Sequence, residues 1–175
     1  GRQLDLAHAI ELASPEVEMP RHRLGRGSFA VVYQALDPML GRHVAIKLPH
    51  PEIAGNEVLL ERTRREARAA AQLRHPGILP IHEVAEHHGR MFVAMEFIEG
   101  PNLEQVIAYA RDQGGALTEA QALDIVLPIL GSLAEAHGLG LIHRDLKPAN
   151  ILLTQVADEP LVVKVVDFGV VRTQD

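Results

Sequence analysis

An α+β fold is what the amino-acid sequence predicts, because strand-like and helix-like segments come in blocks instead of alternating regularly. The first half holds β-branched runs at 31–33 and 44–48, which favour paired strands. The stretch 57–73 is rich in Ala, Leu and Arg and lacks Gly and Pro, so it predicts a helix. Two further helical patterns follow after residue 101. We therefore expect a small antiparallel sheet with one helix, followed by a second, mainly helical lobe.

Turn signals separate the strands of the first lobe. Asp37-Pro38-Met39-Leu40-Gly41 predicts a turn that pairs the first two runs as antiparallel strands. Pro76-Gly77 ends the helix, because neither residue continues a helix well. Two more strands are expected at 78–85 and 91–98, joined by a turn at His87-His88-Gly89.

The second lobe begins where Glu99-Gly100-Pro101 interrupts the strand pattern. Asn102 can cap a helix that runs to about Asp112, and Thr118 with Gln121 forms a capping box for a longer one. Pro128 is expected to kink this helix, and Gly138-Leu139-Gly140 to end it. The last third contains two short apolar runs, Ile151 to Leu153 and Leu161 to Val166. We divide the chain into an extension or linker at 1–16, a sheet lobe at 17–98 and a helical lobe at 99–175.

Composition excludes several classes of protein. The 175 residues carry 17 Lys and Arg against 23 Asp and Glu, so nothing suggests a nucleic-acid or anionic-membrane partner. The absence of cysteine rules out a disulfide framework and thiolate metal sites. No apolar run approaches the ~18 residues of a spanning helix. We expect a cytoplasmic location, with this chain as a fragment of a longer and possibly membrane-anchored polypeptide, since it begins at Gly1 without Met. Dimerisation is not indicated.

A glycine-rich run, Gly25-x-Gly27-x-x-Ala30-x-Val32, is the first motif with chemical content. Gly-x-Gly-x-x-Ala also occurs in dinucleotide-binding loops, but those open a helix. Here Val31-Val32-Tyr33 follows, which favours a hairpin. Small residues would let the N–H groups of Ser28 and Phe29 approach phosphates, although a hairpin turn that merely prefers glycine is the simpler alternative. If position 30 needs a positive φ, alanine costs about 1 kcal/mol there.

Lys47 ends the apolar strand run Val44-Ala45-Ile46. An ammonium buried at this place needs anionic neighbours. The alternative is an ordinary strand-end lysine whose charged head reaches water.

Four motifs occur in an order that resembles the eukaryotic-type (Hanks-type) serine/threonine protein kinases of bacteria. They are the glycine run, Val44-Ala45-Ile46-Lys47, His143-Arg144-Asp145-Leu146-Lys147-Pro148-Ala149-Asn150 and Asp167-Phe168-Gly169. The resemblance covers nearly all of the chain after residue 17, and only Ala30 departs from the pattern. It implies a protein-kinase-like fold with a complete small lobe and the first part of the helical lobe, ending shortly after the Asp-Phe-Gly motif.

The resemblance also implies a role for each polar residue. Lys47 would contact the α- and β-phosphates of ATP, held by Glu66, with Glu57 and Glu61 as less suitable competitors. Asp145 would orient the acceptor hydroxyl and take its proton, while Lys147 would neutralise the transferred phosphoryl group. Asn150 and Asp167 would bind Mg²⁺. His143 is expected to be a packed core residue. The implied nucleotide-binding set is Gly25, Gly27, Ser28, Phe29, Val32, Ala45, Lys47, Met95, Glu96, Ile98 and Leu152.

The implied reaction is transfer of the ATP γ-phosphoryl group to Ser or Thr hydroxyls of a protein substrate. A nucleotide-binding scaffold without turnover is one alternative, but such modules usually lack an equivalent of Lys47, Asp145 or Asp167. A small-molecule phosphotransferase of related fold is another, and Lys147-Pro148 favours the protein-directed branch. We expect this chain alone to hold nucleotide weakly and to transfer phosphate poorly or not at all.

Overall fold

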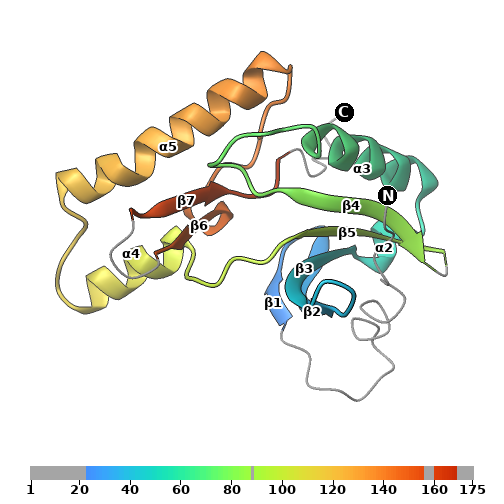
Figure 1. Ribbon diagram of the computed structural model, residues 1–175, viewed down its shortest axis with the longest axis horizontal. Helices are drawn as coiled ribbons and strands as arrows, with labels where there is room; N and C mark the ends of the chain where they lie inside the picture. Colours follow the sequence, from blue (N-terminus) through green and yellow to red (C-terminus); the bar gives the residue numbers. More distant parts are fainter. Residues whose placement is uncertain (1–22, 88, 156–159, 169–175) are drawn as a thin grey trace. The chain divides into compact units, whose positions relative to one another are not determined.

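The computed structural model describes residues 23–87, 89–155 and 160–168 (Figure 1). Within these, the chain forms two compact units. The sheet unit comprises residues 23–71 and 80–97, and the helical unit comprises residues 72–79 and 98–168. The extension predicted at 1–16 and the Gly169 of the last motif lie outside the described residues.

The sheet unit contains one antiparallel sheet with the strand order β1-β2-β3-β5-β4. The predicted turn between its second and third strands is confirmed: Asp37 Oδ1 accepts hydrogen bonds from the N–H groups of Met39 and Leu40, both at 3.1 Å. Gly41 completes that turn at a φ of 62°, which a residue without a Cβ adopts readily. The strands are β1 (Arg23–Arg26), β2 (Ala30–Asp37), β3 (Arg42–Pro49), β4 (Ile81–His87) and β5 (Arg90–Glu96).

The strand register gives the two faces of this sheet different side chains. Val44 and Ile46 of β3 join Phe92 and Ala94 in the buried apolar cluster on one face. Successive side chains alternate along a strand, so Ala45 and Lys47 belong to the opposite face. Register pairs Ala45 with Met95 and Lys47 with Val32, which places four predicted site residues on that second face.

Two helices follow β3 in the sheet unit. The predicted helix is confirmed as α3 (Glu57–Ala70), whose first turn is capped by Asn56 Oδ1 at 3.1 Å from the Leu59 N–H. It ends three residues earlier than residue 73, with Ala71 as its C-cap. The one-turn helix α2 (Pro51–Ala54) was not predicted; Pro51 stands in its first turn, where proline loses no hydrogen bond.

The strand predicted at 78–85 starts later than expected. β4 begins at Ile81, because Ile78 and Leu79 pair elsewhere: Ile78 bridges to Val165, and the Leu79 N–H donates to the Val165 carbonyl at 3.1 Å. These two residues therefore belong to the helical unit. Tertiary pairing overrides the local β-propensity here.

The helical unit is built from two capped helices and a short hairpin. Asn102 with Gln105 and Thr118 with Gln121 each form a reciprocal capping box, which confirms both predicted helix starts. The longer helix continues through Pro128, and the hydroxyl of Ser132 donates to the Pro128 carbonyl at 2.9 Å. The predicted kink stays a prediction. The elements are α4 (Leu103–Asp112), α5 (Glu119–Gly138), the 3₁₀ turn η1 (Pro148–Asn150), β6 (Ile151–Thr154) and β7 (Val162–Val165).

Candidate functional site

The glycine run forms the tip of the β1–β2 hairpin. Gly27 donates its N–H to the Ala30 carbonyl at 2.9 Å, and Gly25 pairs with Val32 in the ladder. This confirms the prediction that the glycine run forms a hairpin and excludes the alternative that it opens a helix. Among the described residues, the non-glycine positions with positive φ do not include Ala30, so the cost considered for alanine does not arise. Ser28 is exposed at the tip, and Phe29 is half-buried.

His50 anchors this hairpin from the end of β3, and sequence reasoning missed it. Its backbone N–H donates to the Phe29 carbonyl at 2.9 Å. Its ring Nε2 lies 2.9 Å from the Gly27 carbonyl oxygen, so the ring donates there from the Nε2–H tautomer. One residue thus fixes two carbonyls of the glycine run. The available sequence signal was its position directly after the strand that carries Lys47.

Lys47 is buried, with 9% of its surface exposed. Ala45 and Met95, on the same face of the sheet, are also buried, and Val32 beside them is half-buried. An ammonium group on a largely apolar face is costly unless an anion compensates its charge. The face therefore offers an apolar surface with one cation at its edge.

Glu66 lies on α3 in the same unit as Lys47. Its Oε1 is 3.2 Å from Nε of Arg62, one helical turn earlier, and its side chain is 21% exposed. The competitor Glu61 is 51% exposed and pairs with Arg64 at 2.7 Å, while Glu57 is exposed in the first turn. Glu66 is thus the least exposed of the three carboxylates, as a structural partner for a buried lysine should be.

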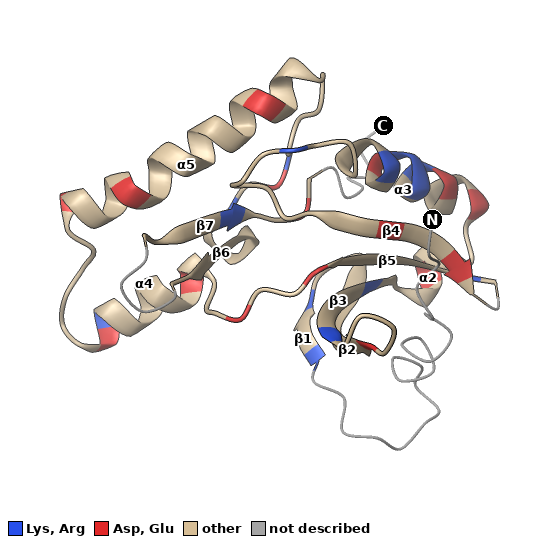
Figure 2. Ribbon diagram, in the orientation of Figure 1, with Lys and Arg blue, Asp and Glu red and all other residues tan. Residues whose placement is uncertain are grey.

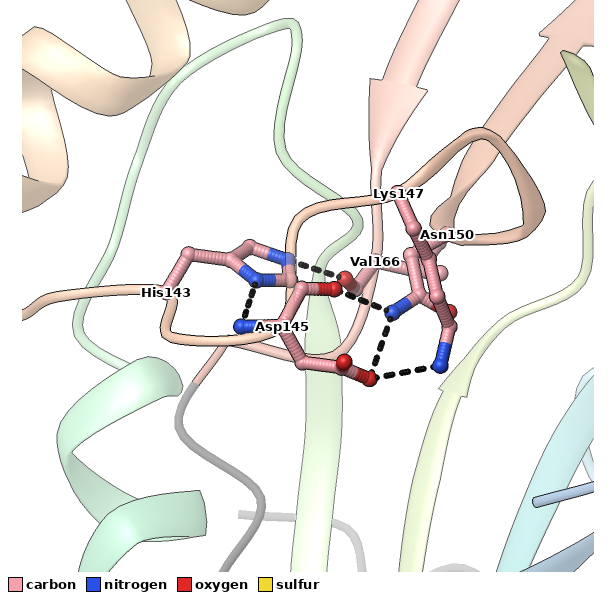
Figure 3. Close-up of polar contacts among 5 residues, drawn as sticks. All are labelled: His143, Asp145, Lys147, Asn150 and Val166. Atoms are coloured by element: carbon pink, nitrogen blue, oxygen red, sulfur yellow. Dashed lines mark hydrogen bonds and ion pairs between the residues drawn. The ribbon is translucent and has the colours of Figure 1, made fainter. Parts of the chain in front are cut away.

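The motif from His143 to Asn150 forms one hydrogen-bonded cluster in the helical unit (Figure 3). Asp145 Oδ2 accepts from Lys147 Nζ at 2.8 Å and from Asn150 Nδ2 at 3.3 Å. The same Asn150 amide donates to the Asp145 backbone carbonyl at 2.8 Å. Asn150 is buried, whereas Asp145 and Lys147 are 41% and 51% exposed. A buried amide therefore holds an accessible carboxylate beside an accessible ammonium.

His143 ties this loop to the end of β7. Its ring is 3% exposed and packs edge-to-face against Phe168 at 4.8 Å between ring centroids. The Asp145 N–H donates to Nδ1 at 3.3 Å, so the ring proton is assigned to Nε2, which donates to the Val166 carbonyl at 2.8 Å. The prediction that His143 is a packed core residue is confirmed.

Two residues of this region have a backbone conformation that side chains disfavour. Arg144 and Asp167 have φ values of 63° and 64°. The left-handed region costs a residue with a Cβ roughly 1–2 kcal/mol, less for Asp, whose side chain bonds locally. Such outliers persist where the surrounding contacts fix them, and they concentrate at functional sites. Both stand inside the predicted motifs.

The donor set suits a magnesium–phosphate group. Because the Asn150 amide nitrogen is directed at Asp145, its Oδ1 is the atom left to act as a ligand. Asp167 supplies a carboxylate just after β7. The residue before it, Val166, donates its N–H to the Asn150 carbonyl at 3.0 Å. The described residues contain no group of three or more His, Asp or Glu that could hold a metal alone. Mg²⁺ bound by few protein oxygens, with phosphate and water completing its shell, fits this set.

The remaining predicted residues are divided between the two units. Glu96 is the last residue of β5 and donates its N–H to the Pro80 carbonyl at 3.0 Å. Ile98 is half-buried in the helical unit. Leu152 is half-buried on β6, opposite Lys164 of β7.

Comparison with known proteins places the chain in a family. The model of the family described as "Protein kinase domain" matches residues 20–175. The chain is 36% identical over 161 residues to a probable serine/threonine-protein kinase PknB of Bifidobacterium longum, covering 87% of this chain and 22% of that protein. It is 42% identical over 149 residues to serine/threonine-protein kinase PknD of Mycobacterium tuberculosis, covering 85% and 21%. The chain thus spans about a fifth of the length of these relatives.

A solved structure shows the same fold. The crystal structure of the Mycobacterium tuberculosis PknI kinase domain matches 86% of this chain and 58% of that domain, with a TM-score of 0.72 and 33% identity. The chain belongs to the protein kinase domain family, and its α+β fold comprises the small lobe and part of the helical lobe. No helix within the described part of the chain is long and apolar enough to span a membrane.

Proposed function

We propose that this chain carries the phosphoryl-transfer machinery of a protein serine/threonine kinase, which moves the γ-phosphoryl group of ATP to a Ser or Thr hydroxyl of a protein. The observation that supports this most is the cluster of Asp145, Lys147 and Asn150, together with family membership. A cytoplasmic location, where ATP and Mg²⁺ are available, belongs to the same proposal.

Asp145 acts on the acceptor hydroxyl in this mechanism. Its carboxylate is accessible, and two hydrogen bonds to Oδ2 hold that oxygen in place. A fixed carboxylate at hydrogen-bond distance from a hydroxyl orients the oxygen and accepts its proton as the new oxygen–phosphorus bond forms and the bond from the γ-phosphorus to ADP breaks. Lys147, 2.8 Å away, supplies a positive charge near the oxygens of the transferred group.

The sheet unit supplies the nucleotide-binding groups. The exposed Ser28 and the half-buried Phe29 present backbone N–H groups at the hairpin tip, where these groups can donate hydrogen bonds to phosphate oxygens. Lys47 offers an ammonium at the edge of the apolar face formed by Val32, Ala45 and Met95, which suits an adenine ring next to its phosphates. Glu66 holds the lysine in place.

Asn150 Oδ1 and the Asp167 carboxylate are the protein ligands that would hold Mg²⁺. When bound, the ion neutralises the negative charge of the β- and γ-phosphates. The backbone bond from Val166 to Asn150 fixes the segments carrying these ligands relative to each other. The relatives' shared name, serine/threonine-protein kinase, and Lys147 support Ser and Thr as acceptors.

The test is transfer of label from γ-³²P-ATP to a generic basic protein by the natural polypeptide that contains this chain. Asp145→Asn should lower transfer by about 10³-fold, because the amide cannot accept the proton. Asp112→Asn, at the exposed end of α4, is the matched control and should leave transfer unchanged. Full transfer by the Asp145→Asn variant would disprove the assigned base, and label only in small molecules would disprove the protein acceptor.

A further inference from the structure

A cavity in the helical unit lies apart from the cluster around Asp145. Its volume is about 560 Å³, and its walls come from the segment 99–101, both helices α4 and α5, and the β6–β7 hairpin. Leu153 of β6 lines it, whereas the neighbouring Leu152 belongs to the predicted nucleotide pocket. None of the residues predicted to bind the nucleotide lines this cavity.

The floor of the cavity is apolar and fixed. Ile125 and Leu153 are 4% and 5% exposed, and the half-buried Val106 of α4 joins them. The Leu153 N–H donates to the Pro101 carbonyl at 2.9 Å, which holds the wall segment against β6. A Cβ at Gly100 would overlap the Leu153 carbonyl oxygen, so this close approach requires glycine. The cavity is therefore a property of the fold, not of one side-chain rotamer.

The rim of the cavity is acidic. Glu99 and Asp124 line it and are exposed, and the lining residues include no Lys or Arg. Among the described residues, neither carboxylate takes part in an ion pair. Figure 2 shows further acidic positions on both flanking helices, α4 and α5. Two uncompensated carboxylates beside an apolar floor favour a ligand that carries aliphatic and cationic groups close together.

We propose that this cavity docks a short segment of the protein substrate in which an aliphatic side chain is flanked by Arg or Lys. The aliphatic group enters the floor between Val106 and Ile125, and the cationic group pairs with Glu99 and Asp124. A peptide suits the site better than a small amine, because an amine alone would leave the apolar floor in water. The proposal rests on the proposed function, since only a protein-directed kinase has such a substrate.

Binding of fluorescein-labelled peptides, measured by anisotropy without ATP or Mg²⁺, tests this proposal. The peptides carry two Arg and two Leu separated by Gly-Ser spacers of different lengths, and the protein is the natural polypeptide that contains this chain. We expect at least one of these peptides to bind. Glu99→Gln combined with Asp124→Asn should weaken that peptide about tenfold and reduce the salt dependence of binding. Replacing both Leu by Ser in the peptide should weaken it as well.

Glu104→Gln is the matched control, because it removes an exposed carboxylate from α4 that does not line the cavity. It should change affinity less than about twofold. Equal weakening by Glu104→Gln would show a general charge effect and overturn the proposal. So would the absence of binding by every peptide, or competition by arginine amide as effective as by the peptide itself.

The readout separates this proposal from the proposed function. Peptide binding that depends on Glu99 and Asp124 without any phosphoryl transfer would retain the docking site and disprove the kinase activity. Transfer that depends on Asp145 without peptide binding would do the reverse. If both hold, a Ser acceptor fused to the binding peptide should show a KM about tenfold higher for the double variant, with kcat unchanged.

Discussion

The two units position their candidate site residues in different ways. In the sheet unit, backbone hydrogen bonds between strands set the positions of these residues. Lys47 stands between Val32 and Val93 in the strand register, and the glycine run is a hairpin tip. In the helical unit, side chains hold one another, since Asp145, Lys147 and Asn150 share hydrogen bonds and His143 ties their loop to Val166.

This difference predicts opposite responses to mutation. A ladder of backbone hydrogen bonds survives the replacement of one side chain, so the sheet unit should lose chemistry without losing stability. A buried polar network leaves unsatisfied groups when one member is removed, and each costs about 1–3 kcal/mol. The helical unit should therefore lose stability together with chemistry.

Among the variants that test this comparison, Lys47→Met should have the largest effect, and it separates chemistry from stability. Phosphoryl transfer should fall by at least about 10²-fold, because the positive charge that Lys47 contributes beside the ATP phosphates is lost. The free energy of unfolding should change by less than about 1 kcal/mol, since a buried ammonium is replaced by an apolar group of similar length. Glu66 keeps Arg62 as a partner. Denaturant unfolding and label transfer measure the two quantities; strong destabilisation would contradict the comparison.

Asn150→Ala tests the helical unit in the same comparison. It removes two hydrogen bonds to Asp145 from a buried position, so the helical unit should lose about 1–3 kcal/mol of stability. Transfer should also fall, and the Mg²⁺ concentration for half-maximal rate should rise, because a ligand is lost. Titration of activity with Mg²⁺ and urea unfolding provide the readouts. Unchanged stability would show that the network is not what holds Asp145.

His50→Ala should have a smaller effect, limited to the nucleotide. Without the ring, the Gly27 carbonyl loses its donor, and the glycine run is held less firmly. The KM for ATP should rise about three- to tenfold with little change in kcat. His50→Gln, which can still donate a hydrogen bond, is the matched variant and should recover part of the loss. Equal KM values for both variants would show that the hydrogen bond from the His50 ring does not position the glycine run.

The smallest effect is a pH dependence of stability in the sheet unit. Burial, and then the nearby Arg42 charge, lower the pKa of His82 below its usual 6.5, against the opposing influence of Glu96 and Asp37. The unfolded chain therefore binds this proton at a higher pH than the folded one does. Stability should decline as pH falls below 6.5 toward the lowered pKa. His82→Gln should flatten this part of the curve in thermal unfolding.

Local signals in the sequence predicted much of the fold. Both capping boxes, the turn at Asp37 and the helix α3 depend on contacts within a few residues, and all appear in the structure. The late start of β4 shows where these local signals fail. β4 starts late because Ile78 pairs with Val165, far away in the sequence, and no local pattern reports such a partner.

The sequence by itself determined which chemical groups this protein can use, because the four motifs name the lysine, the carboxylates and the amide. Tertiary structure alone decided how they are held. The anchoring of the glycine run by His50 and the acidic cavity lined by Gly100 both bring together segments that are distant in the sequence. Local propensities carry no information about such contacts, since each exists only when the chain has closed upon itself.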